Sequence, residues 1–421
     1  MKNKIIYPAQ MSTQSLGRLT VSVIQDTGLI PIPDAVVRIT PEGEPTRVVA
    51  EVTTDEIGRT EAIELEAPPE EYSLEPESPM PYSEYTITAS APNFDQVEIH
   101  GAQILPNVTA VQPVELIPII EEDPYAAHAF NVEPHTLYGE YPPKIAEDEI
   151  KPIDETGEIV LREVVVPEFV IVHDGVPTDS SAPNYYVRYN DYIKNVASSE
   201  IYATWPESAI YANVLAIMSF TLNRVYTEWY RNQGYNFTIT SSTAFDHKWM
   251  SGRNIYSNIS LIVDTIFNNY LSRPNVSQPI LTQYCDGNRV TCPGWLSQWG
   301  SKNLADQGYD AIDIIRNYYG SNMFINEAPA VAGVPSSFPG FNLDIGASGD
   351  YVRQLQDQLN TIAAVYTAIP RIAVDGIYGP NTKKAVEEFQ RIFGLPANGI
   401  VDLPTWYRIS HIYVAVTRIA E

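Results

Sequence analysis

The sequence predicts a multidomain α+β protein with an N-terminal β-sandwich, a central α+β domain and a C-terminal bundle of three helices. Three observations lead to this prediction: short alternating strands before residue 118, a long apolar helix near the middle of the chain, and amphipathic helices near its end. The 421 residues suffice for several domains. We expect an N-terminal arm (1–16), a sandwich (17–118), an acidic Pro-rich linker or strap (119–164), a central domain (165–325), a linker (326–340) and the bundle domain (341–421).

The charge and the cysteines exclude several classes of protein. A net charge of −26 argues against nucleic acid as a partner, because binding phosphates needs clustered Lys and Arg. The N-terminus lacks the hydrophobic region of a secretory signal, so we expect no classical signal peptide. Cys285 and Cys292 form either a local disulfide or two buried thiols, and no metal or cofactor is predicted. His128 and His135 are expected to be solvated loop histidines rather than metal ligands.

The first domain is predicted from alternating segments such as GRLTVSVI, which begins at Gly17, and YTITASA, which begins at Tyr85. Together with the turns between them, they resemble the carboxypeptidase regulatory-like, prealbumin-type sandwich. The resemblance implies a spacer or adhesion unit without chemistry of its own. A protein partner is therefore expected to bind through this domain.

The central domain is organised around a long helix in which Pro206 suits the first position and the segment from Ala209 to Trp229 is apolar. Its apolar side chains lie on every face, so the helix should be buried. Charged residues interrupt it, and a membrane span is not expected. Other predicted elements are strands at 165–173, 185–189 and 279–285, and a helix over 255–270.

Two blocks of this domain are similar to the SpoIID/LytB-like (stage II sporulation protein D) family: DYIKNVASSEI…WPESAIYANVLAIMSFTLNRVY and, about 90 residues later, LSQWGSKNLADQGYDAIDIIRNYYG. The resemblance implies a lytic transglycosylase that breaks the MurNAc–GlcNAc bond of peptidoglycan, with Glu200 as general acid and base. The chain departs from the family at two places. A family histidine is absent from TCPGWLSQ, and a Cys/His zinc pair is absent from TSSTAFDHKW. His247 is therefore expected to be structural.

The residues around Glu200 suit this role, because Ile201, Tyr202 and Trp205 flank it. Burial against such side chains raises the pKa of a carboxyl group, and a catalytic acid must stay protonated near neutral pH. The alternative is that Glu200 lies in the first turn of a helix capped by Ser198 and Ser199. The expected substrate-binding residues of the central domain are Trp205, Asp246, Tyr284, Ser297, Gln298 and Trp299.

The last 80 residues contain LDIGASGDYVRQLQDQL, VDGIYGPNTKKAVEEFQ and GLPANGIVDLPTW. These motifs resemble the three-helix peptidoglycan-binding module of the PG_binding_1 type. Val352, Leu355 and Leu359 share one face of the first helix, as expected for a bundle. Asp375 and Tyr378, in the turn between the first two helices, are the expected ligand-binding residues.

The leading hypothesis is a protein that binds and cleaves peptidoglycan. The alternative is a non-catalytic wall-anchoring protein. Either one would work at the cell wall, within a spore envelope, or in an extracellular phage-tail-like particle.

Overall fold

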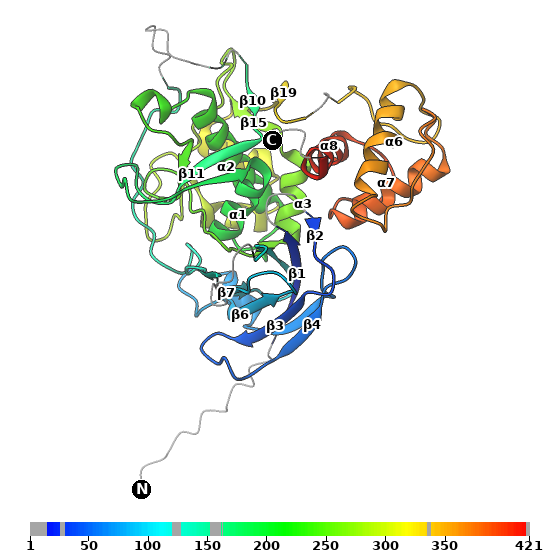
Figure 1. The fold of residues 1–421 in the computed structure, drawn as a ribbon. Coiled ribbons are helices and arrows are strands. Elements are labelled where there is room, and N and C mark those ends of the chain that lie inside the picture. The colour runs from blue at the N-terminus through cyan, green and yellow to red at the C-terminus, as the bar shows by residue number, and fades with distance from the viewer. Residues whose placement is uncertain are drawn as a thin grey trace.

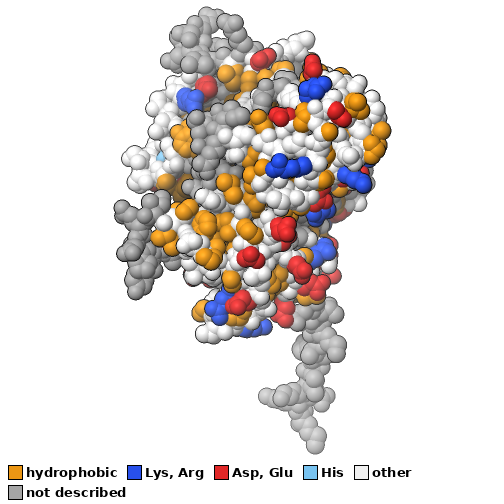
Figure 2. Space-filling view, turned by 45° about the vertical axis from the view of Figure 1, so that its right-hand side comes forward, with side chains coloured by type: hydrophobic (Ala, Val, Ile, Leu, Met, Phe, Trp, Pro, Cys, Tyr) orange, Lys and Arg blue, Asp and Glu red, His pale blue; other side chains and the backbone are white. Residues whose placement is uncertain are grey.

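The computed structural model describes residues 15–25, 30–119, 128–151, 161, 163–334 and 338–417. Most of the predicted N-terminal arm and parts of both predicted linkers lie outside these residues. Figure 1 shows a blue sandwich, a green and yellow central domain and an orange bundle, with the red helix α8 reaching back toward the central domain. On the face drawn in Figure 2, Lys and Arg lie singly among acidic side chains.

The sandwich forms because its strands alternate in burial. Along β1, Leu19, Val21 and Val23 are fully buried while the residues between them face outward. The other strands of this domain are β2 (Ile30–Pro31), β3 (Val36–Pro41), β4 (Ala50–Thr53), β5 (Ile63–Ala67), β6 (Ser83–Ser90), β7 (Val97–Ile104) and β8 (Thr109–Leu116), and β1 spans Ser15–Gln25. A 3₁₀ turn, Glu70–Ser73, follows β5.

Each sheet of the sandwich includes one strand from a part of the chain that follows residue 118. One sheet has the order β14-β8-β1-β2, with β5 also paired to β1, and the other has the order β4-β3-β6-β7-β9. Strand β9 (His128–Asn131) runs parallel to β7, and β14 (Ile255–Tyr256) runs antiparallel to β8. The predicted range 17–118 omits both strands, because pairs this short carry no periodic signal. They join the sandwich to the rest of the chain.

The chain after β9 lies against the central domain as a strap, which we define as residues 132–151. Its side chains Val132, His135, Leu137, Tyr141 and Lys144 are buried. His135 stacks on Tyr202 with 4.4 Å between ring centroids, and its exposed fraction is 0%. The expectation of a solvated loop histidine is therefore wrong for His135. His128 is partly exposed and lies 3.6 Å from Asp95.

The central domain packs its helices around α2 (Glu207–Tyr226). The other elements of this domain are β10 (Val165–Val166), β11 (Phe169–His173), β12 (Asn184–Arg188), α1 (Tyr189–Glu200), a 3₁₀ turn (Arg231–Gln233), β13 (Ile239–Thr240), α3 (Ser257–Ile266), β15 (Asn269–Ser272), β16 (Tyr284–Cys285), β17 (Leu296–Ser297), α4 (Gln298–Asp306), α5 (Ala311–Tyr319), β18 (Phe324–Glu327) and β19 (Ala330–Val331). Nearly every side chain of α2 is buried, as predicted. Among the described residues, no helix is both long and apolar enough to cross a membrane.

Tertiary pairing shortens several predicted elements. The helix expected over 255–270 spans only α3, because Ile255 and Tyr256 pair with β8 and β15 pairs with β18. The predicted strand 279–285 forms a ladder only at β16. The predicted linker 326–340 begins with residues of β18 and also contains β19, which pairs with β10. Sequence periodicity cannot reveal such pairings, because each depends on a distant partner.

The bundle consists of α6 (Asp350–Ile362), α7 (Pro380–Ile392) and α8 (Leu403–Thr417). The side chains Val352, Leu355 and Leu359 are buried, which confirms the predicted apolar face of α6. A repeated motif holds the turns: the side-chain oxygen of Gln356 accepts from Gly376 N, and that of Gln390 accepts from Gly399 N, both at 2.8 Å. Helix α8 also contacts α3, where Tyr407 packs edge-on against Phe267.

Candidate functional site

Glu200 is the last residue of α1, and its exposed fraction is 0%. It therefore lies at the C-terminal end of a helix, and the alternative of a capped first-turn residue is wrong. Helix dipoles favour negative charge at the N-terminus and disfavour it at the C-terminus. Neither the dipole nor solvent stabilises an ionised Glu200.

Three groups donate hydrogen bonds to the Glu200 carboxyl. The backbone N–H of Lys248 lies 2.6 Å from Oε1, and the Tyr284 hydroxyl lies 2.5 Å from Oε2. Gln298 Nε2 lies farther from Oε2, at 3.4 Å. The structure thus brings together Glu200 from the first sequence block, Tyr284 from β16 and Gln298 from the second block.

Burial raises the pKa of Glu200 above its ordinary value, and nearby Lys144 and the hydrogen bonds from Lys248 and Tyr284 act in the opposite direction. As placed, the Gln298 amide donates to Glu200 at 3.4 Å, which favours the ionised form. Its Oε1 is buried and has no hydrogen-bond partner among the described residues. If the amide turned over, this oxygen would accept the proton of a neutral Glu200. The site is thus suited to a protonated acid.

The strap covers this carboxyl with two side chains. Tyr141 is 7% exposed, and burial followed by the charge of Glu200 raises its pKa well above the ordinary value. Lys144 Nζ lies 4.9 Å from the ring centroid of Tyr284 and donates to the backbone oxygen of Asp246. Burial lowers the pKa of Lys144, while Glu200 and Asp246 raise it. In this conformation the strap closes the site, and no glycan strand can reach Glu200.

Several contacts hold the strap in place. Arg289 donates to the carbonyl oxygens of Thr136 and Gly139. Farther along, Arg224 binds Glu147 with 2.6 Å between Nη2 and Oε1, and Arg273 binds Glu149 with 2.7 Å between Nε and Oε1.

The two tryptophans expected to bind substrate lie in a domain interface instead. Trp205 and Trp299 are 3% and 6% exposed, with ring centroids 5.0 Å apart. The indole N–H of Trp205 donates to the backbone oxygen of Ser73 in the sandwich. This packing explains their burial, and neither ring presents a face to a ligand.

Asp246, another predicted groove residue, is fully buried and holds an ion pair with Arg224 at 2.7 Å. Its second carboxyl oxygen accepts from the Tyr230 hydroxyl and from Thr240. Both carboxyl oxygens accept hydrogen bonds from protein groups, so the substrate-binding role expected for Asp246 gives way to a structural one. His247 is also buried, and its Nδ1 lies 3.1 Å from the Tyr192 hydroxyl.

Ser297 caps α4 by accepting a hydrogen bond from Gly300 N at 2.9 Å. It precedes Gln298, and β17 pairs with β16 next to Tyr284. A disulfide joins Cys285 to Cys292, so the first of the two expected alternatives is correct. The cap, the short ladder and the disulfide together position Tyr284 and Gln298 beside Glu200.

In the bundle, Asp375 is exposed and Tyr378 is not. One oxygen of Asp375 accepts from Ile377 N at 2.9 Å and from Gln356 Nε2 at 2.8 Å, so this side chain stabilises the turn. Tyr378 is 1% exposed, and its hydroxyl donates to the Gly399 carbonyl. A ligand can reach Asp375, whereas Tyr378 is a core residue.

Sequence reasoning missed Tyr141 and Lys144, two buried strap residues that interact electrostatically with Glu200. They stand in the segment YGEYPPKIAEDEI, whose composition is typical of an exposed linker. The single lysine among four acidic residues was the one available signal.

A family model of the peptidoglycan binding domain, PG_binding_1, matches residues 348–409. The zinc D-Ala-D-Ala carboxypeptidase of Streptomyces albus G is 42% identical over 67 residues, which are 16% of this chain and 25% of that protein. The chain thus spans about a quarter of the length of this curated relative.

Two solved structures are similar to parts of the chain. The SleB N-terminal domain is 31% identical, covering 18% of this chain and 99% of that one, with a TM-score of 0.16. The 5-hydroxyisourate hydrolase of Klebsiella pneumoniae is 15% identical, covering 24% and 90%, with a TM-score of 0.16. The family match identifies residues 348–409 as a peptidoglycan binding domain, which supports binding of peptidoglycan by this part of the chain.

Proposed function

We propose that this chain also cleaves the peptidoglycan that it binds, as a lytic transglycosylase acting on the MurNAc–GlcNAc bond with Glu200 as the acid and base. One observation carries the proposal. A fully buried carboxyl group with a raised pKa lies within hydrogen-bond distance of Tyr284 and Gln298, which come from a distant part of the chain. The SpoIID/LytB-like resemblance of the two blocks supports the same reaction.

The reaction needs one carboxyl group. Protonated Glu200 gives its proton to the bridging oxygen as the bond from that oxygen to C1 of MurNAc breaks, which releases the GlcNAc hydroxyl. The C6 hydroxyl oxygen of the same MurNAc then bonds to C1, and its proton passes to the Glu200 carboxylate. The product is a 1,6-anhydro sugar, no water is consumed, and the acid is restored. A hydrolase would more often use two carboxylates.

Cleavage requires the strap to move, because Tyr141 and Lys144 cover Glu200. We therefore propose a latent enzyme. The bundle domain anchors the chain to the wall, and Glu200 acts only after the strap has been displaced. Lys144 leaves with the strap, and its loss removes one of the groups that lower the pKa of Glu200.

The same burial favours a second function, that of a non-catalytic wall-anchoring protein. The exposed fraction of Glu200 is 0%, and three arginines hold the strap that lies over it. An active site that has lost its activity would have the same features. In this reading the central domain only spaces the sandwich from the bundle.

Digestion of purified peptidoglycan separates the two functions. Wild type, Glu200→Gln and the strap-loosened variant Arg289→Met would be incubated with the wall, and anhydro-muropeptides would be measured by mass spectrometry. The enzyme hypothesis expects products from Arg289→Met at least, and none from the double variant with Glu200→Gln. Binding to the wall with no product from any variant would establish the anchoring function.

The setting and partner are proposals too. The protein would act at the wall from a spore envelope or from a phage-tail-like particle, with a protein partner bound through the sandwich. Detection of the chain in purified spores or in purified tail particles decides between these settings.

A further inference from the structure

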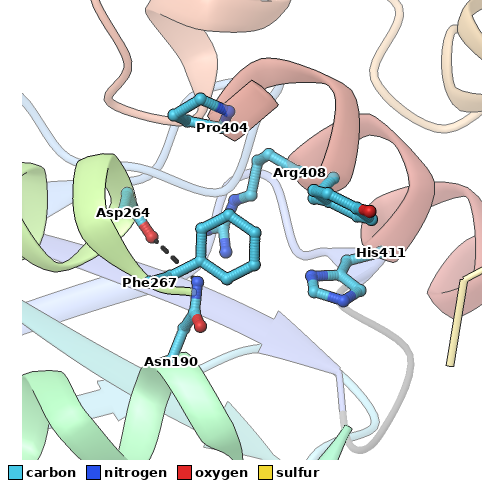
Figure 3. Close-up of a pocket in the computed structure, with 7 residues that line it drawn as sticks. Asn190, Asp264, Phe267, Pro404, Arg408 and His411 are labelled. Carbon is cyan, nitrogen blue, oxygen red and sulfur yellow. Dashed lines mark hydrogen bonds between the residues drawn. The ribbon is translucent and has the colours of Figure 1, made fainter. Parts of the chain in front are cut away.

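A cleft lies where α8 meets the central domain, away from Glu200. Its two parts share Asn190, Arg408 and His411, so they form one continuous depression. The larger part encloses a cavity of about 60 Å³ and opens to solvent. In Figure 3, Arg408 and His411 project from α8 toward Phe267 and Asn190. One wall therefore comes from the peptidoglycan-binding domain and the other from the central domain.

Three lining residues have buried polar atoms without a hydrogen-bond partner in the described part of the chain. These atoms are the Tyr189 hydroxyl, Arg408 Nε and His411 Nε2. Leaving a buried donor or acceptor unpaired costs about 1–3 kcal/mol each. Three such atoms around one cleft are available to hydrogen-bond a polar ligand.

Some of the charged side chains that line the cleft form ion pairs with other residues of the protein. Asp264 binds Lys194 at 2.7 Å, and Glu168 binds Arg188 at 3.3 Å. Arg408 and Asp191, by contrast, have no ion pair among the described residues, and both line the cleft. An uncompensated cation and an uncompensated anion face the same space. A ligand that carries both a carboxylate and an amine matches them.

We propose that this cleft binds the stem peptide of peptidoglycan, with a stem carboxylate on Arg408 and the side-chain amine of the diamino acid near Asp191. His411 and Tyr189 supply further hydrogen bonds to the peptide. The inference rests on the proposed action at peptidoglycan and adds a part of the polymer that the Glu200 site does not contact. Because the site spans both domains, an occupied cleft also holds α8 against α1 and α3.

The test uses the full chain and a soluble tetrapeptide, N-acetyl-L-Ala-γ-D-Glu-meso-diaminopimelate-D-Ala, in titration calorimetry at pH 7. Arg408→Gln is expected to weaken binding about 10- to 100-fold, as for loss of a charge-assisted hydrogen bond. His411→Gln is a second variant that keeps Arg408. The matched control is Arg391→Gln, because Arg391 lies on α7 with its side chain 60% exposed. Thermal melts confirm that each variant is folded.

A second peptide, with Ala in place of the diamino acid, tests the role of Asp191. It should bind wild type at least about tenfold more weakly, whereas Asp191→Asn should bind the two peptides almost equally. No binding of the first peptide, equal weakening by Arg391→Gln, or no effect of Arg408→Gln and His411→Gln would each overturn the proposal. The assay involves no glycan and no cleavage, so failure of the Glu200 reaction does not alter its result.

Discussion

The Tyr284 hydroxyl lies 2.5 Å from Oε2 of Glu200, although 84 residues separate the two in the chain. Both side chains are buried. The hydrogen bond favours the ionised carboxylate, so it opposes the effect of burial on the pKa of Glu200. The balance between these two effects sets the pH range over which Glu200 can serve as an acid.

Replacing this hydroxyl should shift the pH dependence of cleavage. In Tyr284→Phe the pKa of Glu200 rises further, so activity should persist to higher pH than with Tyr284 in place. The variant should also lose roughly 1–2 kcal/mol of stability, since a buried carboxyl loses a donor. Anhydro-muropeptide release would be measured against pH in the Arg289→Met background. An alkaline limit that stays in place would contradict this account of Glu200.

Glu200→Gln should change how stability depends on pH. The pKa of Glu200 is raised in the folded protein, so the folded state holds its proton above pH 4.5 while the unfolded chain releases it. Wild type therefore loses stability as the pH rises from about 4.5 through the folded pKa. Gln cannot ionise, so the variant does not lose this stability. The difference between the free energy of unfolding of the variant and that of wild type should therefore increase as the pH rises over this window. Urea unfolding between pH 4 and 8 measures the difference, and a constant difference would refute a raised pKa.

Loosening the strap should expose Glu200. Arg289→Met removes the donors to Thr136 and Gly139, and we expect faster hydrogen exchange at strap amides such as Thr136 N and Ile145 N, which bond to the central domain. Release of anhydro-muropeptides should rise in parallel. Arg316→Met is the control, because Arg316 donates to Met323 outside the strap. Unchanged hydrogen exchange at the strap amides of Arg289→Met would show that this arginine does not hold the strap in place.

Asp246→Asn should behave as a structural change. The substitution leaves the buried Arg224 with only Glu147 as a carboxylate partner, and breaking a buried pair costs about 3–5 kcal/mol. The side chain of Asp306, which pairs with the buried Lys302, is itself 45% exposed, so Asp306→Asn should cost less, about 1 kcal/mol. Wall binding by the folded variant should remain, since residues 348–409 are untouched. Denaturant unfolding and wall sedimentation check both expectations. If Asp246→Asn were as stable as Asp306→Asn, the structural role would be contradicted and substrate binding by Asp246 would again be the better explanation.

The site could be predicted in part. Glu200, Tyr284 and Gln298 were named from the sequence, and the structure brings these three together. The positions of Trp205 and Trp299 could not be predicted, because aromatic side chains suit both sugar faces and domain interfaces, and sequence does not distinguish these uses. Tyr378 was expected to bind a ligand for the same reason, but its hydroxyl donates to a backbone carbonyl within the bundle.

By itself the sequence determined the local elements of this protein: the apolar faces of α6 and α7, the turns between them, and the buried helix α2. These features depend on spacings within a few residues, which the chain carries in its own order. Only the tertiary structure decided that an acidic, Pro-rich segment would cover Glu200 with Tyr141 and Lys144, and that α8 would form a cleft with the central domain. Both results depend on contacts between residues far apart in the chain, whose free energy exists only once the domains have packed.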